Sequence, residues 1–286
     1  MVTSQLERNR ADKLTVCFTT ADATKSAARA TTEWVDMKTT NKLIVALDVK
    51  TADEAQRLVD MLRGIAGMFK IGSQLFTATG PGFVREIVNS GERVFLDLKF
   101  HDIPNTVAAA GIAATRLGVS IFNVHAAGGS EMMRRTAAAV AQSAEAEGLT
   151  RPSIIAVTVL TSADPMTLVE TGWSATPENL VERLSLLAEA AGMDGVVASP
   201  REVGIVRSVV KTPGFIVVTP GVRPAGAAVG DQSRVTTPRE AIAAGADYLV
   251  VGRPIIEAAD PARAAMQIID EMETGSTYNI RQSDGT

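Results

Sequence analysis

The run Phe95-Leu96-Asp97-Leu98-Lys99-Phe100-His101-Asp102-Ile103-Pro104-Asn105-Thr106 places charged residues inside an apolar segment. Its first half predicts a β-strand, because apolar residues dominate it and Pro104 cannot continue a sheet ladder. Side chains alternate across a strand, so Asp97 and Lys99 share one face and the leucines beside them take the other. Charges on a buried face are costly unless a site uses them. With Asp102 in the following loop, the run forms an Asp-x-Lys-x-x-Asp array.

The chemistry of this array depends on the charge of Lys99. A lysine that forms a Schiff base must first lose its proton. Carboxylates stand on both sides of Lys99 in the sequence and favour its charged form. Lys99 is therefore better suited to donate a proton or to anchor a negative charge than to act as a nucleophile. A purely structural ion pair between Asp97 and Lys99 explains the array equally well.

Around this strand, apolar runs of strand length alternate with helical patterns. The predicted strands cover 43–47, 68–71, 94–98, 119–124, 154–160, 195–198, 215–218 and 248–251. The predicted helices cover 52–63, 82–89, 105–117, 130–147, 177–191, 200–209, 238–244 and 261–273. Eight such units with near-continuous apolar strands predict an α/β fold, a (β/α)8 barrel of the TIM type. A doubly wound open sheet is the alternative, but no Gly-x-Gly-x-x-Gly follows the first strand.

The barrel accounts for one domain, residues 41–273, of the 286-residue chain. Residues 1–40 are rich in Ser, Thr, Ala and mixed charges without a sustained period, which predicts a disordered N-terminal extension. Residues 274–286 are polar and predict a frayed C-terminal tail.

Composition excludes several classes of function. A formal net charge of -4 gives no basic surface for nucleic acid. Cys17 is the only cysteine, so an internal disulfide is impossible, and with only two histidines, His101 and His125, a zinc site is improbable. No apolar run is long enough to cross a membrane, and no signal peptide is recognisable. We therefore expect a cytoplasmic protein without a metal.

Polar residues stand where most of the predicted strands end. In a (β/α)8 barrel, the carboxyl ends of the strands carry the site. One polar residue at a strand end can be a turn former, but a ring of them favours a functional site. The ring consists of Asp48, Lys70, Asp97, Lys99, Asn123, His125, Thr158, Thr161, Gly221, Arg223, Gly252 and Arg253.

The last two loops of the barrel favour an anion such as phosphate. In phosphate-binding barrels these loops supply backbone amides to the ligand. Gly252 permits close approach of the backbone, and Arg253 offers a fork of donors. The Gly-rich loop 221–236 is long enough to close over a bound phosphate as a lid. The alternative for Gly252-Arg253-Pro254 is a tight turn with an exposed arginine.

Taken together, these motifs closely resemble the bacterial type of the orotidine 5'-phosphate decarboxylase family. The resemblance extends from residue 43 to about 270, and the run from Asp97 to Thr106 is its most specific part. The other matching pieces are Ala46-Leu47-Asp48, Phe69-Lys70-Ile71-Gly72, Asn123-Val124-His125-Ala126, Val157 to Ser162, Thr219 to Pro224, Gly230-Asp231-Gln232 and Gly252-Arg253-Pro254.

The resemblance implies decarboxylation of orotidine 5'-monophosphate to UMP, without a cofactor, by a homodimer. In such an enzyme Lys99 donates a proton to C6 and Asp97 lies near the substrate carboxylate. Asp102 comes from the partner subunit, with Ile103 and Thr106 nearby. The other implied ligand contacts are Asp48 and Lys70 to the ribose, Thr161 and Arg223 to the ligand, and Gln232, Gly252 and Arg253 to the phosphate.

Two alternatives stay open at this point. Magnesium-dependent keto-gulonate-phosphate decarboxylases and hexulose-phosphate synthases share the Asp-x-Lys-x-x-Asp array. They differ in the second strand, where a glutamate helps to hold the metal and this chain has Lys70. The other alternative is a barrel that binds phosphorylated ligands without catalysis.

Overall fold

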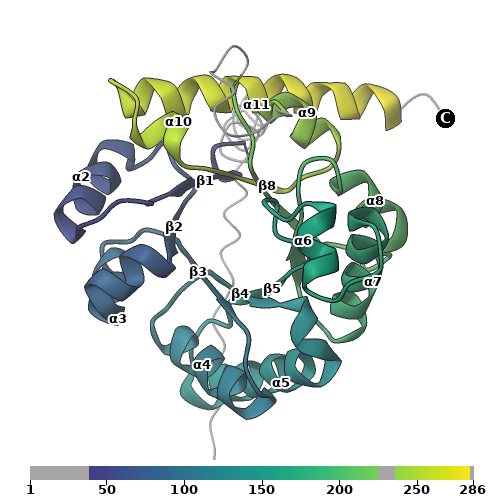
Figure 1. Ribbon diagram of the computed structural model, residues 1–286. Coiled ribbons are helices and arrows are strands. Elements are labelled where there is room, and N and C mark those ends of the chain that lie inside the picture. The colour runs from purple at the N-terminus through teal and green to yellow at the C-terminus, as the bar shows by residue number, and fades with distance from the viewer. Residues whose placement is uncertain (1–38, 225–235, 284–286) are drawn as a thin grey trace, which may run out of the picture. The chain divides into compact units, whose positions relative to one another are not determined.

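Eight parallel strands close into a barrel in the computed structural model, which describes residues 39–224 and 236–283 (Figure 1). Strands that follow each other in the chain are neighbours, and β1 pairs with β8 to close the ring. The predicted (β/α)8 barrel is confirmed, and the open sheet is wrong. The strands are β1 (Leu43–Ala46), β2 (Met68–Gly72), β3 (Val94–Phe100), β4 (Ile121–His125), β5 (Ser153–Val157), β6 (Gly195–Val197), β7 (Ile216–Pro220) and β8 (Tyr248–Val251).

Helices surround the barrel on its outside (Figure 1). Within the described residues, no helix combines the length and the apolar character that crossing a bilayer requires. The helices are α2 (Ala52–Leu62), α3 (Ser73–Asn89), α4 (Pro104–Arg116), α5 (Gly129–Glu147), α6 (Pro165–Glu170), α7 (Pro177–Ala190), α8 (Val203–Val209), α9 (Pro238–Ala243), α10 (Arg253–Ile256), α11 (Pro261–Ser283) and the short 3₁₀ turn η1 (Ala126–Gly128).

Local sequence signals set where several helices begin. Thr51 caps α2 and Thr237 caps α9, each in a reciprocal capping box with a glutamate three residues later. Proline in the first turn supplies a suitable φ and lacks the N–H that would be left unbonded there. Pro104 begins α4 in this way, immediately after the charged strand.

Alternation along the strands divides the apolar core into two layers. Phe95 belongs to a cluster inside the barrel, whereas Leu96 and Leu98 pack in the layer between strands and helices. The predicted alternation of β3 is therefore confirmed. On three adjacent strands, the residue two positions after an inward apolar residue is polar and buried. These pairs are Met68 and Lys70, Phe95 and Asp97, and Ile121 and Asn123.

Two elements begin or end at different residues from those predicted. The helix predicted at 82–89 begins at Ser73, since α3 continues across a kink at Gly80 and Pro81. The strand predicted at 154–160 ends at Val157, because its neighbour β6 is short and offers no ladder partner beyond Val197.

Two further elements are more helical than predicted. The segment after Thr161, where no helix is predicted, contains α6, capped by the Asp164 side chain. Six residues are too few to display a helical period, so only the cap and Pro165 signalled this helix. The last helix, predicted to end at 273, continues through Ser283.

Gly195 in β6 should be irreplaceable, because a Cβ built there would lie 2.7 Å from Cβ of Ile216 and even closer to that residue's carbonyl oxygen. Gly195→Ala should destabilise the protein by about 2–3 kcal/mol through overpacking. Gly204→Ala is the matched control, because Gly204 is exposed in α8 with open space around its Cβ position. It should stabilise by roughly 0.5–1 kcal/mol. Urea unfolding measures both, and equal effects would contradict this account.

Candidate active site

A row of alternating charges crosses the carboxyl ends of the first three strands. Lys70 Nζ lies 2.9 Å from Asp48 Oδ1 and 3.3 Å from Asp97 Oδ2. On the other side of Asp97, Lys99 Nζ lies 2.6 Å from Oδ1. The structure therefore brings together four of the predicted site residues, in the order Asp48, Lys70, Asp97 and Lys99.

The centre of this row is buried and its charges are mutually stabilised. Lys70 and Asp97 are only 8% and 9% exposed. Burial alone raises the pKa of Asp97, but the charges of Lys70 and Lys99, with hydrogen bonds from Lys99 and Asn123, outweigh burial. The pKa of Asp97 therefore lies below its ordinary value, and its carboxylate is ionised at neutral pH.

Lys99 has an unusual backbone. Its φ is 52°, and it is the one non-glycine residue with positive φ in the described part of the chain. The register between β3 and β4 shifts between Leu96 and Phe100, so a regular ladder does not serve this segment. A left-handed conformation costs an L-residue about 1–2 kcal/mol. Such strain persists only where surrounding contacts hold it.

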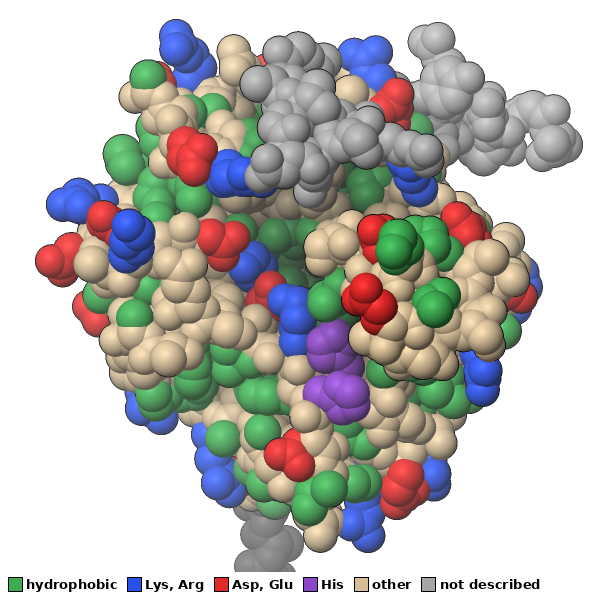
Figure 2. All heavy atoms as spheres, in the orientation of Figure 1, with side chains coloured by type: hydrophobic (Ala, Val, Ile, Leu, Met, Phe, Trp, Pro, Cys, Tyr) green, Lys and Arg blue, Asp and Glu red, His purple; other side chains and the backbone are tan. Residues whose placement is uncertain are grey.

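A cavity of about 170 Å³ opens above the buried row. One wall carries Lys70, Asp97 and Lys99, whereas the opposite walls are apolar. Figure 2 shows charged side chains of both signs gathered in a hollow at the centre of this face. The remaining lining residues are Phe95, Val157, Val159, Leu160, Thr161, Val197, Val218, Pro220 and Val250.

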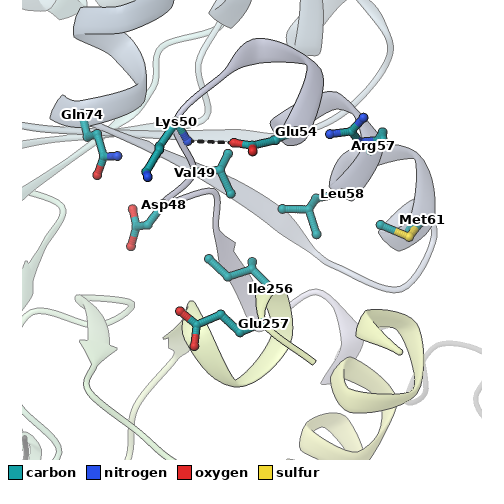
Figure 3. A pocket seen from close by; sticks show the side chains of 10 residues that line it. All are labelled: Asp48, Val49, Lys50, Glu54, Arg57, Leu58, Met61, Gln74, Ile256 and Glu257. Carbon is teal, nitrogen blue, oxygen red and sulfur yellow. Dashed lines mark hydrogen bonds between the residues drawn. The ribbon is translucent and has the colours of Figure 1, made fainter. Parts of the chain in front are cut away.

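A wider groove of about 440 Å³ lies beside the first strand, between α2 and α10 (Figure 3). Figure 3 shows Asp48 and Glu257 at one end of the groove and Met61 at the other. Asp48 lines the groove and also pairs with Lys70, which lines the cavity. A ligand larger than the cavity therefore has adjoining space past Asp48.

Two arginines lie close to this end of the barrel. Burial lowers the pKa of Arg223, and the nearby charge of Arg253 lowers it further. Among the described residues, neither arginine has a carboxylate within ion-pairing distance. A Cβ built on Gly252 would lie 3.5 Å from Asp48 Oδ2, so the start of α10 adjoins the charged row. Glu257 is the carboxylate that acts on Arg223 and raises its pKa, so the two guanidinium groups together keep a net positive charge that can bind an anion.

Other predicted residues do not join the row within this chain. Asp102, Ile103 and Thr106 are exposed, and Ile103 is 66% exposed despite its apolar side chain. The Asp102 carboxylate accepts a hydrogen bond from the neighbouring Ile103 amide. Thr161 lines the cavity. Gln232 and most of the predicted lid lie outside the described residues.

Asn123 belongs to the predicted ring of strand-end residues, but the sequence predicted no role for it. In the structure its side chain is buried and bonds to Asp97. The sequence carries one signal for this position: Asn123 follows the inward-facing Ile121 by two residues, so its side chain faces the same way.

His125 is half-buried, and its ring lies 5.5 Å from that of His101. Burial lowers the pKa of His125, and the nearby His101 and Lys99 lower it further. Figure 2 shows this histidine pair beside the central hollow.

Gly72 leaves room for the charged row, because a Cβ there would lie 3.0 Å from Lys70 Nζ and 3.6 Å from Asp48 Oδ1. Its φ of -92° suits alanine. Gly72→Ala should therefore change the free energy of unfolding by less than about 1 kcal/mol. It should displace the ammonium end of the Lys70 side chain, which is flexible enough to move. A crystal structure of the variant should show the Lys70 to Asp48 distance lengthened. Gly82→Ala, with open space around it, is the control; an unchanged ion pair in Gly72→Ala would contradict this.

Comparison with known proteins agrees with this geometry. Residues 41–268 match the family model described as orotidine 5'-phosphate decarboxylase / HUMPS family. Proteins named orotidine 5'-phosphate decarboxylase from Geobacter sulfurreducens and Moorella thermoacetica are each 54% identical, over 82% and 84% of this chain and 97% and 96% of their own lengths. A crystal structure of that name from Lactobacillus acidophilus has a TM-score of 0.71 and 34% identity, covering 80% of this chain and 98% of its own.

A closed barrel, a row of paired charges at its carboxyl end and similarity over most of the chain lead to one assignment. The chain belongs to the orotidine 5'-phosphate decarboxylase / HUMPS family.

Proposed function

We propose that this protein converts orotidine 5'-monophosphate to UMP and carbon dioxide, the last step of pyrimidine nucleotide synthesis. The observation that carries the proposal is the charged row beside the cavity, in a chain 54% identical to proteins named for this activity. Roles of individual residues follow from the positions of their charges. The charged nucleotide substrate, which does not cross bilayers unaided, supports a cytoplasmic location.

Lys99 is the proton donor in this proposal. When the bond between C6 and the carboxylate breaks, carbon dioxide leaves and the electron pair stays on C6. The ammonium of Lys99 stabilises that charge and then transfers its proton to C6, which gives UMP. The amine is reprotonated from solvent. Because a fixed ammonium performs both tasks, this mechanism requires no organic electron sink.

Asp97 orients Lys99 through the 2.6 Å hydrogen bond that the lysine donates to its carboxylate. It also places a negative charge beside the substrate carboxylate, which disfavours the bound ground state more than the transition state. Asp48 and Lys70 bind ribose hydroxyls. Their own 2.9 Å contact keeps the lysine in place without substrate.

The phosphate binds at the last two loops. Arg223 and Arg253 supply guanidinium donors, and Gly252 permits close approach of the backbone. We infer that Gln232, which lies outside the described residues, adds a contact to the phosphate, and that Thr161, which lines the cavity, contacts the ligand. Binding energy from the phosphate, which is remote from the reacting carbon, can then be used to position the reacting group.

The magnesium-dependent alternative fits the charged row poorly. Lys70 Nζ stands between the carboxylates of Asp48 and Asp97, within 3.3 Å of each. A divalent cation bound by these two carboxylates would have to displace or oppose that ammonium. A non-catalytic barrel is disfavoured because the proton donor and its carboxylate partner are both in place.

The absorbance of orotidine 5'-monophosphate, followed with purified protein in excess EDTA, tests the proposed function. We expect substrate absorbance to fall rapidly, and added Mg²⁺ to leave the rate unchanged. Turnover only with Mg²⁺ would assign the protein to the metal-dependent relatives. Binding of UMP without turnover in either condition, by folded protein, would instead support a binding role.

A homodimer completes the site in this proposal. Asp102 and Ile103 are exposed and separate from the charged row of their own chain. An exposed apolar side chain next to an exposed carboxylate suits a contact with a second subunit. Asp102 then enters the partner's site near Lys99, with Ile103 and Thr106 beside it.

Subunit complementation tests the shared site. Lys99→Ala and Asp102→Ala should each abolish most turnover, while retaining UMP binding at the arginines. Mixed and refolded together, the two variants should recover about a quarter of wild-type activity, because half the dimers are mixed and each has one intact site. Each variant refolded alone is the control. Absence of recovery, with mixed dimers verified by mass, would mean that each chain supplies its own Asp102.

A further inference from the structure

We propose that Asn123 is a positioning residue that aims both catalytic side chains, Asp97 and Lys99, through two hydrogen bonds. It lies in β4, next to the strand that carries them (Figure 1). The inference rests on the proposed decarboxylation and adds a residue to its machinery.

The first bond runs to the carboxylate. Asn123 Nδ2 donates to Asp97 Oδ1 over 2.7 Å, and the same oxygen accepts from Lys99 Nζ over 2.6 Å. The amide thus fixes which Asp97 oxygen faces Lys99, while the other oxygen faces Lys70. A carboxylate held from both sides cannot rotate away from the lysine.

The second bond runs to the backbone of the lysine. The Lys99 N–H donates to Asn123 Oδ1 over 2.8 Å. This N–H belongs to the residue with φ of 52°, at the place where the β3–β4 register shifts. The amide oxygen therefore occupies the position of a ladder acceptor and holds the strained conformation from which the Lys99 side chain enters the cavity.

Asn123 performs this task from below the cavity. It is 1% exposed and does not belong to the cavity lining, whereas Asp97 and Lys99 do. Only a side chain with a donor and an acceptor side by side can serve both partners. A carboxylic acid has this pair only when protonated, which provides a test.

Asn123→Ala removes both bonds, and we expect kcat to fall about 100-fold, since a displacement near 1 Å of a reacting group has that effect. KM should change much less, because Asp48, Lys70 and the arginines still bind the ligand. Without the amide donor the pKa of Asp97 rises, so the acid limb of the pH profile moves to higher pH.

Asn123→Asp keeps the size and reverses the pH trend. At low pH the introduced carboxyl shares a proton with Asp97, which restores a donor and leaves an acceptor for the Lys99 N–H. At higher pH both carboxyl groups ionise and repel each other. The charged groups that face them are Lys70 and Lys99, and the His101–His125 pair lies beside Lys99. The ratio of variant to wild-type kcat should therefore rise as pH falls, opposite to Asn123→Ala.

Thr115→Val is the matched control. Thr115 is buried in α4, and its hydroxyl donates to the Gly111 carbonyl of the same helix over 2.9 Å, without contact to Asp97 or Lys99. Losing this buried hydrogen bond should leave kcat within about twofold of the wild-type value and should not change the pH profile of kcat.

Kinetics with orotidine 5'-monophosphate from pH 5 to 9, on variants whose folding is checked by thermal melting, decide the matter. If Asn123→Ala does not fold, the pH trend of Asn123→Asp decides alone. Wild-type kcat in both variants, or a loss in Asn123→Asp that does not vary with pH, would overturn the inference. An inactive wild-type protein would instead overturn the proposed function.

Discussion

The site depends on one electrostatic constraint, the placement of a buried carboxylate between two ammonium groups. Asp97 touches Lys70 on one side and Lys99 on the other, and Asn123 bonds to it from the next strand. Burying a single charge in a barrel is strongly unfavourable, but alternating charges compensate one another. Removing Asp97 would leave Lys99 without its carboxylate partner, whereas Lys70 would keep its contact with Asp48. The row therefore centres on Asp97, whose carboxylate stays ionised at neutral pH.

Barrel closure converts this row into a site. Because β1 pairs with β8, Asp48 at one end of the row adjoins Gly252 at the start of α10. The charged row and the guanidinium groups of Arg223 and Arg253 then lie on the same rim, although they come from opposite ends of the barrel sequence. Apolar side chains of the later strands form the other walls of the cavity. They lower the local dielectric and so strengthen electrostatic interactions of Lys99 inside the cavity.

Much of this fold could be predicted from local patterns. Apolar runs such as that ending at Val251 marked strands, and threonine caps such as Thr51 marked helix starts. The errors arose where local signals were ambiguous. Gly80 and Pro81 suggested a break, but the helix kinks and continues there, and α6 is too short to show a period. For the site, charged residues on apolar strands were conspicuous. Asn123 was less so, since an amide at a strand end is equally suited to a turn.

The sequence by itself determined which residues form strands, which of them face the barrel interior, and that Asp97 and Lys99 share a face. These are consequences of a two-residue period, which is local. Only the tertiary structure decided that Lys70 stands between Asp48 and Asp97, because that depends on pairing such as Ala46 with Lys70 and Gly72 with Asp97. It also decided that Lys99 takes a left-handed backbone bonded to Asn123. The physical reason is that register and strain are set by contacts between segments distant in sequence, which no local pattern records.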